Sequence, residues 1–366
     1  MIVDDVARDR TPDGWRLSAA VDSALTPDGE RLHFTVHGAE PEWLPPVGDA
    51  FLAALMMPAM ALKEDVRVHA PVSRRLFRSA STITDIYTAW WPHLHPVDLR
   101  APVATHGAGD AVGLFFTAGV DSFYSLLKDV ARSAAPDWEP VTHLLFANFE
   151  RKTGAWHERL LARLRHVAAR TGKQLLVIDT NVRSLCEPTA FWPEYHGAAL
   201  ASVALSLQGL LGRCLIASSD QYRHLPPLGS HPLLDHLFST EGLEIVHDGA
   251  EATRAEKVIR LAGEGDLALD NLCVCWKSEP GHNCGHCQKC VGTMVALELA
   301  GASGRCATLP TALDLELVGA VPMPDEPGRV TMRSLVRDAE NRGRQDIADA
   351  LRDGLRRAGD PPQVGS

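Results

Sequence analysis

The sequence VGLFFTAGVDSFYSLL, residues 112–127, combines an apolar run, a turn of small residues and the start of a helix. Residues 112–116 are apolar throughout, which is typical of a buried strand. A small-residue turn then leaves the strand, and a helical pattern continues to about residue 132. We therefore predict a strand that leads directly into a helix. The start of such a helix attracts anions, because its unpaired N–H groups and its dipole both present positive charge.

The alternation of strand and helix continues toward the C-terminus. Further strands are predicted at residues 142–147, 174–179, 213–218 and 244–247, and further helices at residues 154–171 and 194–211. Strands that are apolar throughout and alternate with helices are typical of a parallel sheet covered on both faces. We therefore predict an α/β domain over residues 109–306.

The regions on either side of this domain follow other patterns. Residues 1–108 predict an α+β accessory region, with strands at 15–25, 31–37 and 66–69 and helices at 47–62 and 72–91. Residues 101–110 are rich in Gly and Ala and predict a linker. Residues 307–366 predict two charged helices over 331–357, followed by a frayed tail.

The composition limits the classes of partner. The 366 residues include 36 Lys and Arg against 46 Asp and Glu, a net charge of −10, so a nucleic-acid partner is not expected. We interpret the basic residues of 151–170, including Arg165 and His166, as a solvated helix face. No apolar run reaches the ~20 residues that a bilayer requires, and the N-terminus lacks the order of a signal peptide. We expect a cytoplasmic protein without membrane contact, and a homodimer remains open.

The turn after the first parallel strand carries groups suited to phosphate. Thr117 and Ser122 offer hydroxyl donors, and Gly119 lets the backbone approach an anion closely. Asp121 would repel phosphate unless Mg²⁺ or a water lay between them. We therefore expect a metal–nucleotide as the ligand of this turn.

Two other nucleotide-binding motifs fit the sequence poorly. A Walker A loop needs Ser or Thr after its Gly-Lys pair, but Gly172-Lys173 is followed by Gln174. The GxG at residues 107–109 precedes the first parallel strand, whereas the dinucleotide motif follows a strand. We therefore assign the phosphate site to the loop at residues 117–122.

Four cysteines lie close together after the last predicted strand. Cys275, Cys284, Cys287 and Cys290 form a C-x8-C-x2-C-x2-C pattern. Two CxxC steps place thiolates around one ion, and four thiolates are a ligand set of structural Zn²⁺. The last three cysteines also have iron–sulfur spacing, but Val291 stands where ferredoxin-type runs carry Pro. We therefore predict a structural zinc site, with iron–sulfur as the alternative.

Polar residues follow the fourth strand of the predicted parallel sheet. Asp220 lies just beyond that strand, and Ser230, His231 and Asp235 lie in the next polar stretch. Ligands of open parallel sheets bind beyond the carboxyl ends of the strands. We therefore expect these four residues to contact the substrate; the alternative is a Pro-rich surface loop.

The loop and the cysteines together resemble the PP-loop ATP pyrophosphatase (adenine nucleotide alpha-hydrolase-like) superfamily. The residues that match its SGGxDS loop are Thr117, Ala118, Gly119, Val120, Asp121 and Ser122, with Ala118 in place of the first Gly. Residues 253–257 are similar to a TKxE segment, with Arg254 in place of Lys. Among these proteins the motif order is most similar to the 7-cyano-7-deazaguanine synthase family. The likeness covers about residues 111–306, and residues 1–108 are an addition to it.

The resemblance implies a Rossmann-like, HUP-type PP-loop fold that binds ATP and Mg²⁺ through the 117–122 loop and Arg254, with Asp121 and Arg254 in catalysis. It also implies an adenylate-forming reaction: a small-molecule carboxylate or carbonyl oxygen attacks ATP, pyrophosphate leaves, and ammonia or an amine displaces AMP to give an amide or nitrile. Sulfur transfer is an alternative within the superfamily. A non-catalytic nucleotide-binding zinc protein is a second alternative.

Overall fold

Five apolar strands form the parallel part of a large sheet. The computed structural model describes residues 1–149, 154–275, 283–324 and 326–360, and these strands are β8 (Ala111–Phe115), β9 (His143–Asn148), β10 (Gln174–Thr180), β11 (Leu211–Ala217) and β12 (Glu244–Asp248). Their order is β12-β11-β8-β9-β10, and each neighbouring pair is parallel. The α/β prediction is confirmed. Because the chain extends the sheet first on one side of β8 and then on the other, the topological switch point lies between β8 and β11.

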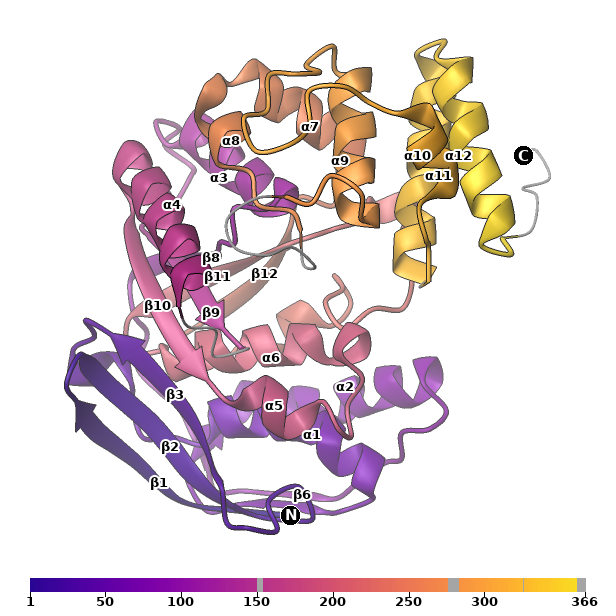
Figure 1. The fold of residues 1–366 in the computed structure, drawn as a ribbon. Helices are drawn as coiled ribbons and strands as arrows, with labels where there is room; N and C mark the ends of the chain where they lie inside the picture. Colours follow the sequence, from indigo (N-terminus) through magenta and orange to yellow (C-terminus); the bar gives the residue numbers. More distant parts are fainter. Residues whose placement is uncertain (150–153, 276–282, 325, 361–366) are drawn as a thin grey trace.

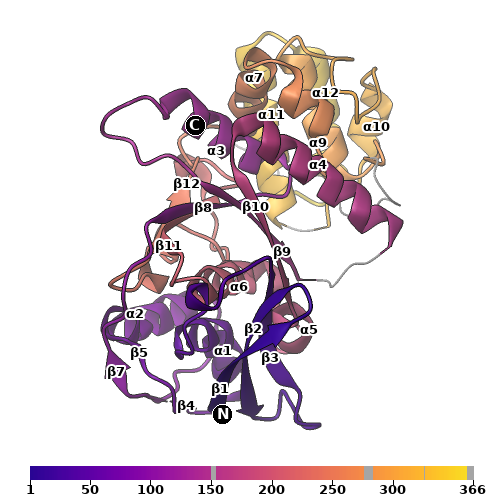
Figure 2. The same ribbon diagram turned by 90° about the vertical axis from the view of Figure 1, so that its left-hand side faces the viewer.

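The N-terminal strands extend the same sheet. They are β1 (Ile2–Thr11), β2 (Gly14–Asp22), β3 (Arg31–His37), β4 (Val66–Val68) and β6 (Leu99–Arg100). β3 pairs antiparallel with β10, with Val36 opposite Ile178. One ten-stranded sheet therefore runs β12-β11-β8-β9-β10-β3-β2-β1-β4-β6. The expected accessory region of residues 1–108 does contain both strands and helices, and it shares its sheet with residues 109–306 (Figure 2).

Helices cover this sheet on both faces (Figure 1). The lower layer in that view consists of α1 (Asp49–Leu62), α2 (Arg74–Trp90), α5 (Val182–Cys186) and α6 (Trp192–Ser206). The upper layer consists of α3 (Val120–Arg132), α4 (Ala155–Thr171), α7 (Arg254–Gly263), α8 (Asp266–Asn271) and α9 (Gln288–Leu299). Each layer has its own hydrophobic core. Residues 49–60 of α1 are all buried, because this helix lies between α6 and the N-terminal strands.

Three C-terminal helices extend the upper layer. They are α10 (Leu315–Ala320), α11 (Glu326–Asn341) and α12 (Gln345–Arg357), and they pack on one another and on α9. The two predicted charged helices are α11 and α12, while most of the predicted tail, residues 361–366, lies outside the described residues. Within the described ranges, the structure has no helix long and apolar enough to cross a bilayer.

The segment predicted as a linker is packed against the rest of the chain. It contains β7 (Val103–Ala104), which pairs with β5 (Val72–Ser73) in a separate two-stranded sheet. His106 Nε2 lies 3.1 Å from the buried Asp49 Oδ2. A Cβ on Gly109 would lie 2.1 Å from the Leu210 backbone, so this glycine allows a close approach of two chain segments. The segment is therefore a fixed connection and not a free linker.

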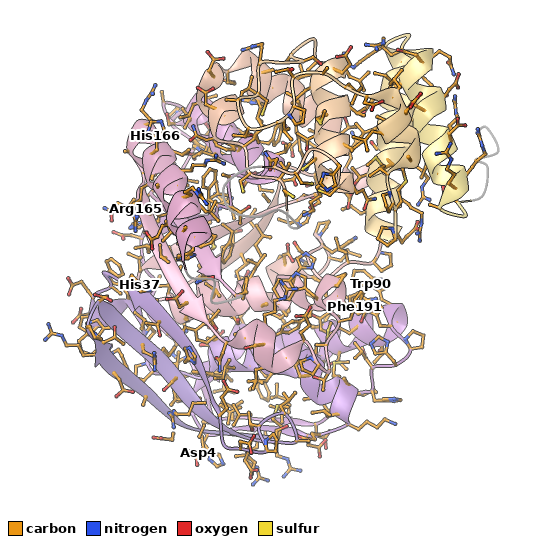
Figure 3. The ribbon with its side chains drawn as sticks, viewed as in Figure 1. Asp4, His37, Trp90, Arg165, His166 and Phe191 are labelled. Carbon is orange, nitrogen blue, oxygen red and sulfur yellow. The ribbon has the colours of Figure 1, made fainter. Side chains whose placement is uncertain are left out.

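Short 3-10 helices and one exposed helix face complete the fold. The 3-10 helices are η1 (Pro41–Trp43), η2 (Tyr222–His224) and η3 (Asp235–Phe238). Arg165 and His166 are exposed on the outer side of α4 (Figure 3). Their position fits the solvated helix face expected from the sequence.

Candidate functional site

The 117–122 loop leaves β8 at the carboxyl edge of the sheet and starts α3. Thr117 is exposed, and the Ser122 hydroxyl donates to the Gly119 carbonyl (3.1 Å). Ala118 has a φ of +58°, in the left-handed region, which disfavours a non-glycine residue by about 1–2 kcal/mol. The glycine of an SGGxDS loop would adopt this conformation freely. In this chain the backbone N–H of Cys273 donates to the Ala118 carbonyl (2.8 Å) and stabilises the strained turn.

Two cations from α7 hold Asp121 in the first turn of α3. Arg254 Nη1 donates to Asp121 Oδ2 at 2.9 Å, and Lys257 Nζ donates to Oδ1 at 3.2 Å. The Lys257 side chain is fully buried and also donates to the Ser218 carbonyl just beyond β11. Lys257 therefore ties the loop after β8 to the loop after β11, the two strands that flank the switch point.

A capping box positions these cations at the start of α7. Thr253 Oγ1 accepts from the Glu256 N–H (3.2 Å), and the Glu256 carboxylate accepts from the Thr253 N–H (2.7 Å). The sequence predicted a role for Arg254 and missed Lys257. The sequence did contain evidence for Lys257, because it lies three residues after Arg254 and residues three apart on a helix share one face.

The charges around Asp121 favour an anionic ligand. Burial raises the pKa of Asp121, but the charges of Lys257 and Arg254 outweigh it and hold this pKa below its usual value, with Lys289 acting in the same direction. Asp220 shows the opposite shift: burial, reinforced by the charge of Asp121, raises its pKa to about 6. Near neutral pH, three cations therefore face one charged carboxylate and a second that is partly protonated. This balance suits a polyphosphate.

A second polar cluster surrounds Asp235, near the carboxyl end of β12. Asp235 is fully buried; its Oδ2 accepts from the Ser230 hydroxyl (2.7 Å) and lies 2.8 Å from His247 Nδ1. Its Oδ1 accepts from the His231 backbone N–H (3.2 Å). The His247 side chain is 5% exposed, and its Nε2 is buried without a hydrogen-bond partner among the described residues. With Nδ1 donating to the carboxylate, Nε2 is the nitrogen that can accept a proton.

Three of the four predicted substrate residues lie in this cluster. Ser230 and Asp235 are buried and hydrogen-bonded to each other. They are therefore part of the interior, whereas the alternative expectation was a Pro-rich surface loop. Asp220 is not hydrogen-bonded to this group; it lies close enough to Asp121 for the two charges to interact. The predicted set is therefore divided between the two layers.

Residues outside the predicted set complete the cluster. The His231 ring packs edge-on against Trp90 of α2, with 4.9 Å between ring centroids, so the N-terminal region contributes to this part of the site. Trp90 lies near the upper border of the lower layer (Figure 3). The sequence missed His247, which ends a predicted strand. Its signal was the alternation of a strand, which places His247 on the same face as the buried Ile245.

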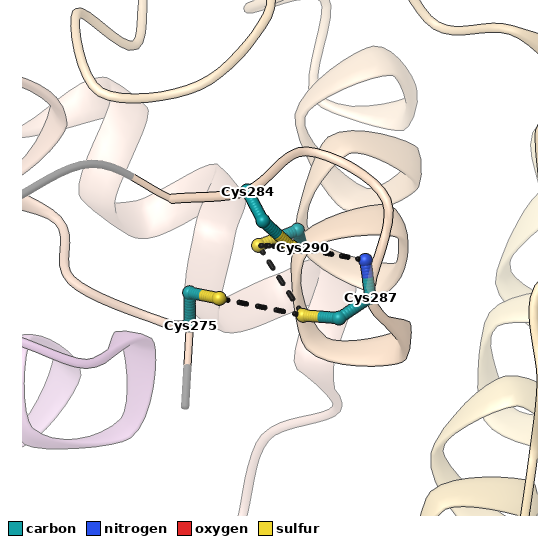
Figure 4. Close-up of side chains that lie close together, drawn as sticks. All are labelled: Cys275, Cys284, Cys287 and Cys290. Carbon is teal, nitrogen blue, oxygen red and sulfur yellow. Dashed lines mark hydrogen bonds between the residues drawn. The ribbon is translucent and has the colours of Figure 1, made fainter. Parts of the chain in front are cut away.

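The four predicted cysteines come together at the start of α9 (Figure 4). Their Sγ atoms all lie within 4.8 Å of one another: Cys287 is 3.5 Å from Cys290 and 3.7 Å from Cys275, and Cys284 is 3.8 Å from Cys290. Four sulfurs bound at ~2.3 Å to one tetrahedral zinc would be roughly 3.8 Å apart. The group is therefore placed to hold a metal such as zinc. Residues 276–282, between the first two cysteines, lie outside the described residues.

The crowding of these thiols favours a bound cation. The hydrogen bond between the Cys287 and Cys290 thiols lowers the pKa of Cys287 to about 4 and raises the pKa of Cys290. A metal that binds all four sulfurs as thiolates removes this conflict, since each ligand can then lose its proton.

The metal segment also supports the 117–122 loop. Cys273, two residues before the first metal ligand, makes the backbone hydrogen bond to Ala118. On α9, Thr293 Oγ1 accepts from Arg254 Nη2 (3.3 Å), and Lys289 lies in sequence between two of the ligands. The segment that carries the four cysteines therefore also carries several partners of the loop and of Arg254.

No protein-family model matches this sequence, and no curated protein is significantly similar to it.

Proposed function

We propose that this chain is an ATP-dependent enzyme that forms an adenylate and then a C–N bond. The observation that carries the proposal is the pairing of Asp121 with Arg254 and Lys257 beside the 117–122 loop, at the switch point of the sheet. Open α/β sheets bind their ligands at this point. Fixed cations beside a helix start suit the phosphates of a nucleotide.

In the proposed first step, an oxygen of the substrate carboxylate bonds to the α-phosphorus of ATP. The bond from that phosphorus to the bridging oxygen breaks, and pyrophosphate leaves with the electron pair. The loop N–H groups and the hydroxyls of Thr117 and Ser122 receive the pyrophosphate, while Arg254 and Lys257 offset its charge. Bound Mg²⁺ would add positive charge to the phosphates. The protein contributes mainly position and electrostatic stabilisation.

In the proposed second step, ammonia or an amine attacks the acyl carbon, AMP leaves, and the nitrogen loses one proton. His247 is our candidate proton acceptor, because its Nε2 has no partner in the described part of the chain. Asp235, at 2.8 Å from Nδ1, would orient the ring and stabilise its charged form.

The proposed role of Asp121 has two parts. The sequence led us to expect that it acts through Mg²⁺, and this stays a prediction. Both of its carboxylate oxygens bond to cations. We therefore also assign it a positioning role, since it holds Arg254 and Lys257 where pyrophosphate would leave.

Product analysis tests this function. The protein is incubated with MgATP, ammonium and pools of small carboxylic acids, and the phosphorus-containing products are identified by ³¹P NMR. The proposal expects AMP and pyrophosphate, lost in Lys257→Met and kept in Arg159→Gln, a substitution of an exposed arginine on α4. ADP and phosphate would contradict it. ATP binding without turnover for any acid would favour the non-catalytic alternative, and a thiolated product the sulfur-transfer alternative.

A further inference from the structure

A small cavity lies between the loop after β11 and the C-terminal helix α11. Its volume is about 290 Å³, and its lining residues are His224, Leu225, Pro226, Val330, Arg333 and Arg337. The loop side belongs to η2, which follows Asp220 closely in sequence and is fixed by a hydrogen bond from the Tyr222 N–H to the Ala250 carbonyl (2.7 Å). The cavity is thus formed by groups that the proposed reaction does not use.

Positive charge is concentrated at this cavity. Arg333 and Arg337 are one turn apart on α11, so they share a helix face. His224 lines the opposite wall, and Arg223 precedes it. Arg333 is neutralised by ion pairs with Glu326 and Asp360.

Arg337, the other arginine of the lining, and Arg223, an exposed neighbour outside the lining, lack such neutralisation. Within the described ranges of the chain, no carboxylate lies within 4.0 Å of the Arg337 or Arg223 guanidinium. Asp338, next to Arg337 in sequence, affects the pKa of Arg337 by a Coulombic interaction and forms no ion pair with it. The cavity therefore carries an excess of positive charge.

The titration of the lining residues reflects this excess. Burial lowers the pKa of His224, and the charges of Arg337 and Arg223 lower it further. Burial also lowers the pKa of Arg337; the charge of Asp338 opposes this, while Arg333 and Arg223 add to it. An anion bound in the cavity would offset the repulsion between these positive charges. The apolar side chains of Leu225, Pro226 and Val330 limit the access of water, which would strengthen the attraction between the anion and the cations.

We propose that this cavity is an anion-binding site for a phosphate or carboxylate group of a small molecule. Arg337, whose guanidinium has no ion-pair partner in the described part of the chain, and the His224 imidazole provide donors suited to such oxygens. The exposed Arg223 adds positive charge beside them. The cavity volume, at the lower end of the range for ligand pockets, fits a small ligand. This site is separate from the proposed pyrophosphate loop and does not depend on it.

Isothermal titration calorimetry with inorganic phosphate, and separately with succinate, tests the proposal on the full chain. The variants are Arg337→Gln and the control Arg159→Gln, which also removes one positive charge but from the exposed face of α4. We expect one of the two anions to bind wild type and the control equally, and Arg337→Gln at least tenfold more weakly. Preference between phosphate and succinate identifies which anion class the site takes.

A loop variant separates this site from the proposed pyrophosphate site. Ser122→Ala removes a hydroxyl of the 117–122 loop and leaves the cavity unchanged. Anion binding that survives in Ser122→Ala and weakens in Arg337→Gln supports the cavity. Binding that weakens only in Ser122→Ala, equal binding by Arg337→Gln and wild type, or no binding of either anion would overturn the proposal. Equal thermal unfolding of the variants confirms that each is folded.

Discussion

Two carboxylates at the carboxyl edge of the sheet, Asp121 partly buried and Asp235 fully buried, have opposite kinds of partner. Asp121, in the upper layer, is paired with the permanent cations Arg254 and Lys257. Asp235, nearer the lower layer, bonds to the Ser230 hydroxyl, a backbone N–H and the His247 ring. The first arrangement surrounds a carboxylate with two cations, whereas the second surrounds one with hydrogen-bond donors and an imidazole. Under the proposed function, the upper layer binds the phosphates and His247 accepts the proton of the second step.

Removal of the metal should have the largest effect, and it should be confined to the upper layer. Structural zinc contributes roughly 10 kcal/mol or more to the folding of small zinc-binding peptides. We expect Cys284→Ser to lose the metal and to expose the amides of α9 and α7 to hydrogen exchange, while α1, α6 and β1–β3 keep their protection. Hydrogen-exchange mass spectrometry and metal analysis measure both effects.

Cys273→Ser is the matched control for that experiment, because Cys273 lies outside the four-cysteine group. It should keep the metal and its protection pattern. Equal loss of protection in both layers would show that the layers unfold together and would weaken the comparison. If the purified protein is brown and contains iron, the four cysteines hold an iron–sulfur cluster and the zinc prediction is wrong.

Lys257→Met should have the next largest effect. It removes the fully buried cation of the pair and leaves the partly buried Asp121 carboxylate with Arg254 alone. Breaking a buried pair costs about 3–5 kcal/mol of unfolding free energy, which is the upper limit that we expect here. The double variant with Asp121→Asn should cost less than the sum of the two single variants, because both substitutions remove the same ion pair. Chemical denaturation measures these values.

His247→Gln is the comparison variant on the other side of the sheet. It replaces one hydrogen-bond partner of Asp235 by a neutral one and removes no permanent cation, so we expect a loss of about 1–3 kcal/mol. If Lys257→Met costs no more than His247→Gln, the electrostatic distinction between the two layers is wrong.

The third prediction concerns Asp220, which should make the unfolding free energy depend on pH. Its pKa of about 6 in the folded state is above its ordinary value, so the folded protein keeps a proton that the unfolded chain has lost. The unfolding free energy should therefore fall as the pH rises from about 4 to about 6, by roughly 3 kcal/mol, and then level. Asp220→Asn should remove this decline, and Asp9→Asn, an exposed control, should not. An unchanged pH profile in Asp220→Asn would contradict the assignment.

Ala118→Gly should have the smallest effect and the opposite sign. Glycine adopts a positive φ freely, so this substitution should raise the unfolding free energy by about 0.5–1 kcal/mol, less than the full strain because glycine also gains freedom in the unfolded chain. Ala162→Gly, at an exposed position of α4, should lower it by about the same amount. Thermal melting compares the two. Destabilisation of both variants would mean that the turn is not strained.

Local sequence patterns predicted the parallel strands and the four-cysteine group. The parallel strands have continuous apolar runs because they are buried on both faces, and the cysteine group is visible as a spacing. Arg254 was predicted from its motif, and the structure places it beside Asp121; its role stays a prediction. Lys257 and His247 were missed because their roles depend on which segments meet: the Ser218 carbonyl and the Asp235 carboxylate reach them only in the folded chain.

The N-terminal part of the sheet was harder to predict from the sequence, for two physical reasons. β1 is largely exposed and rich in charge, and its alternation is interrupted by a register shift between Asp4 and Ala7, with Asp5 at φ +48°. The pairing of β3 with β10 depends on residues far apart in sequence, which no local pattern encodes.

The junction of β3 and β10 has a consequence for the chain during synthesis. His33 donates its backbone N–H to the side chain of Asn181, 148 residues further along. At about 5–20 residues per second, the ribosome would take on the order of ten to thirty seconds to deliver this partner. Throughout that interval the nascent β1–β2–β3 sheet has an unpaired edge, which other polypeptides can extend. Slow stretches of translation between these strands would lengthen the exposure, so aggregation in cells should depend on codon choice there as well as on the final fold.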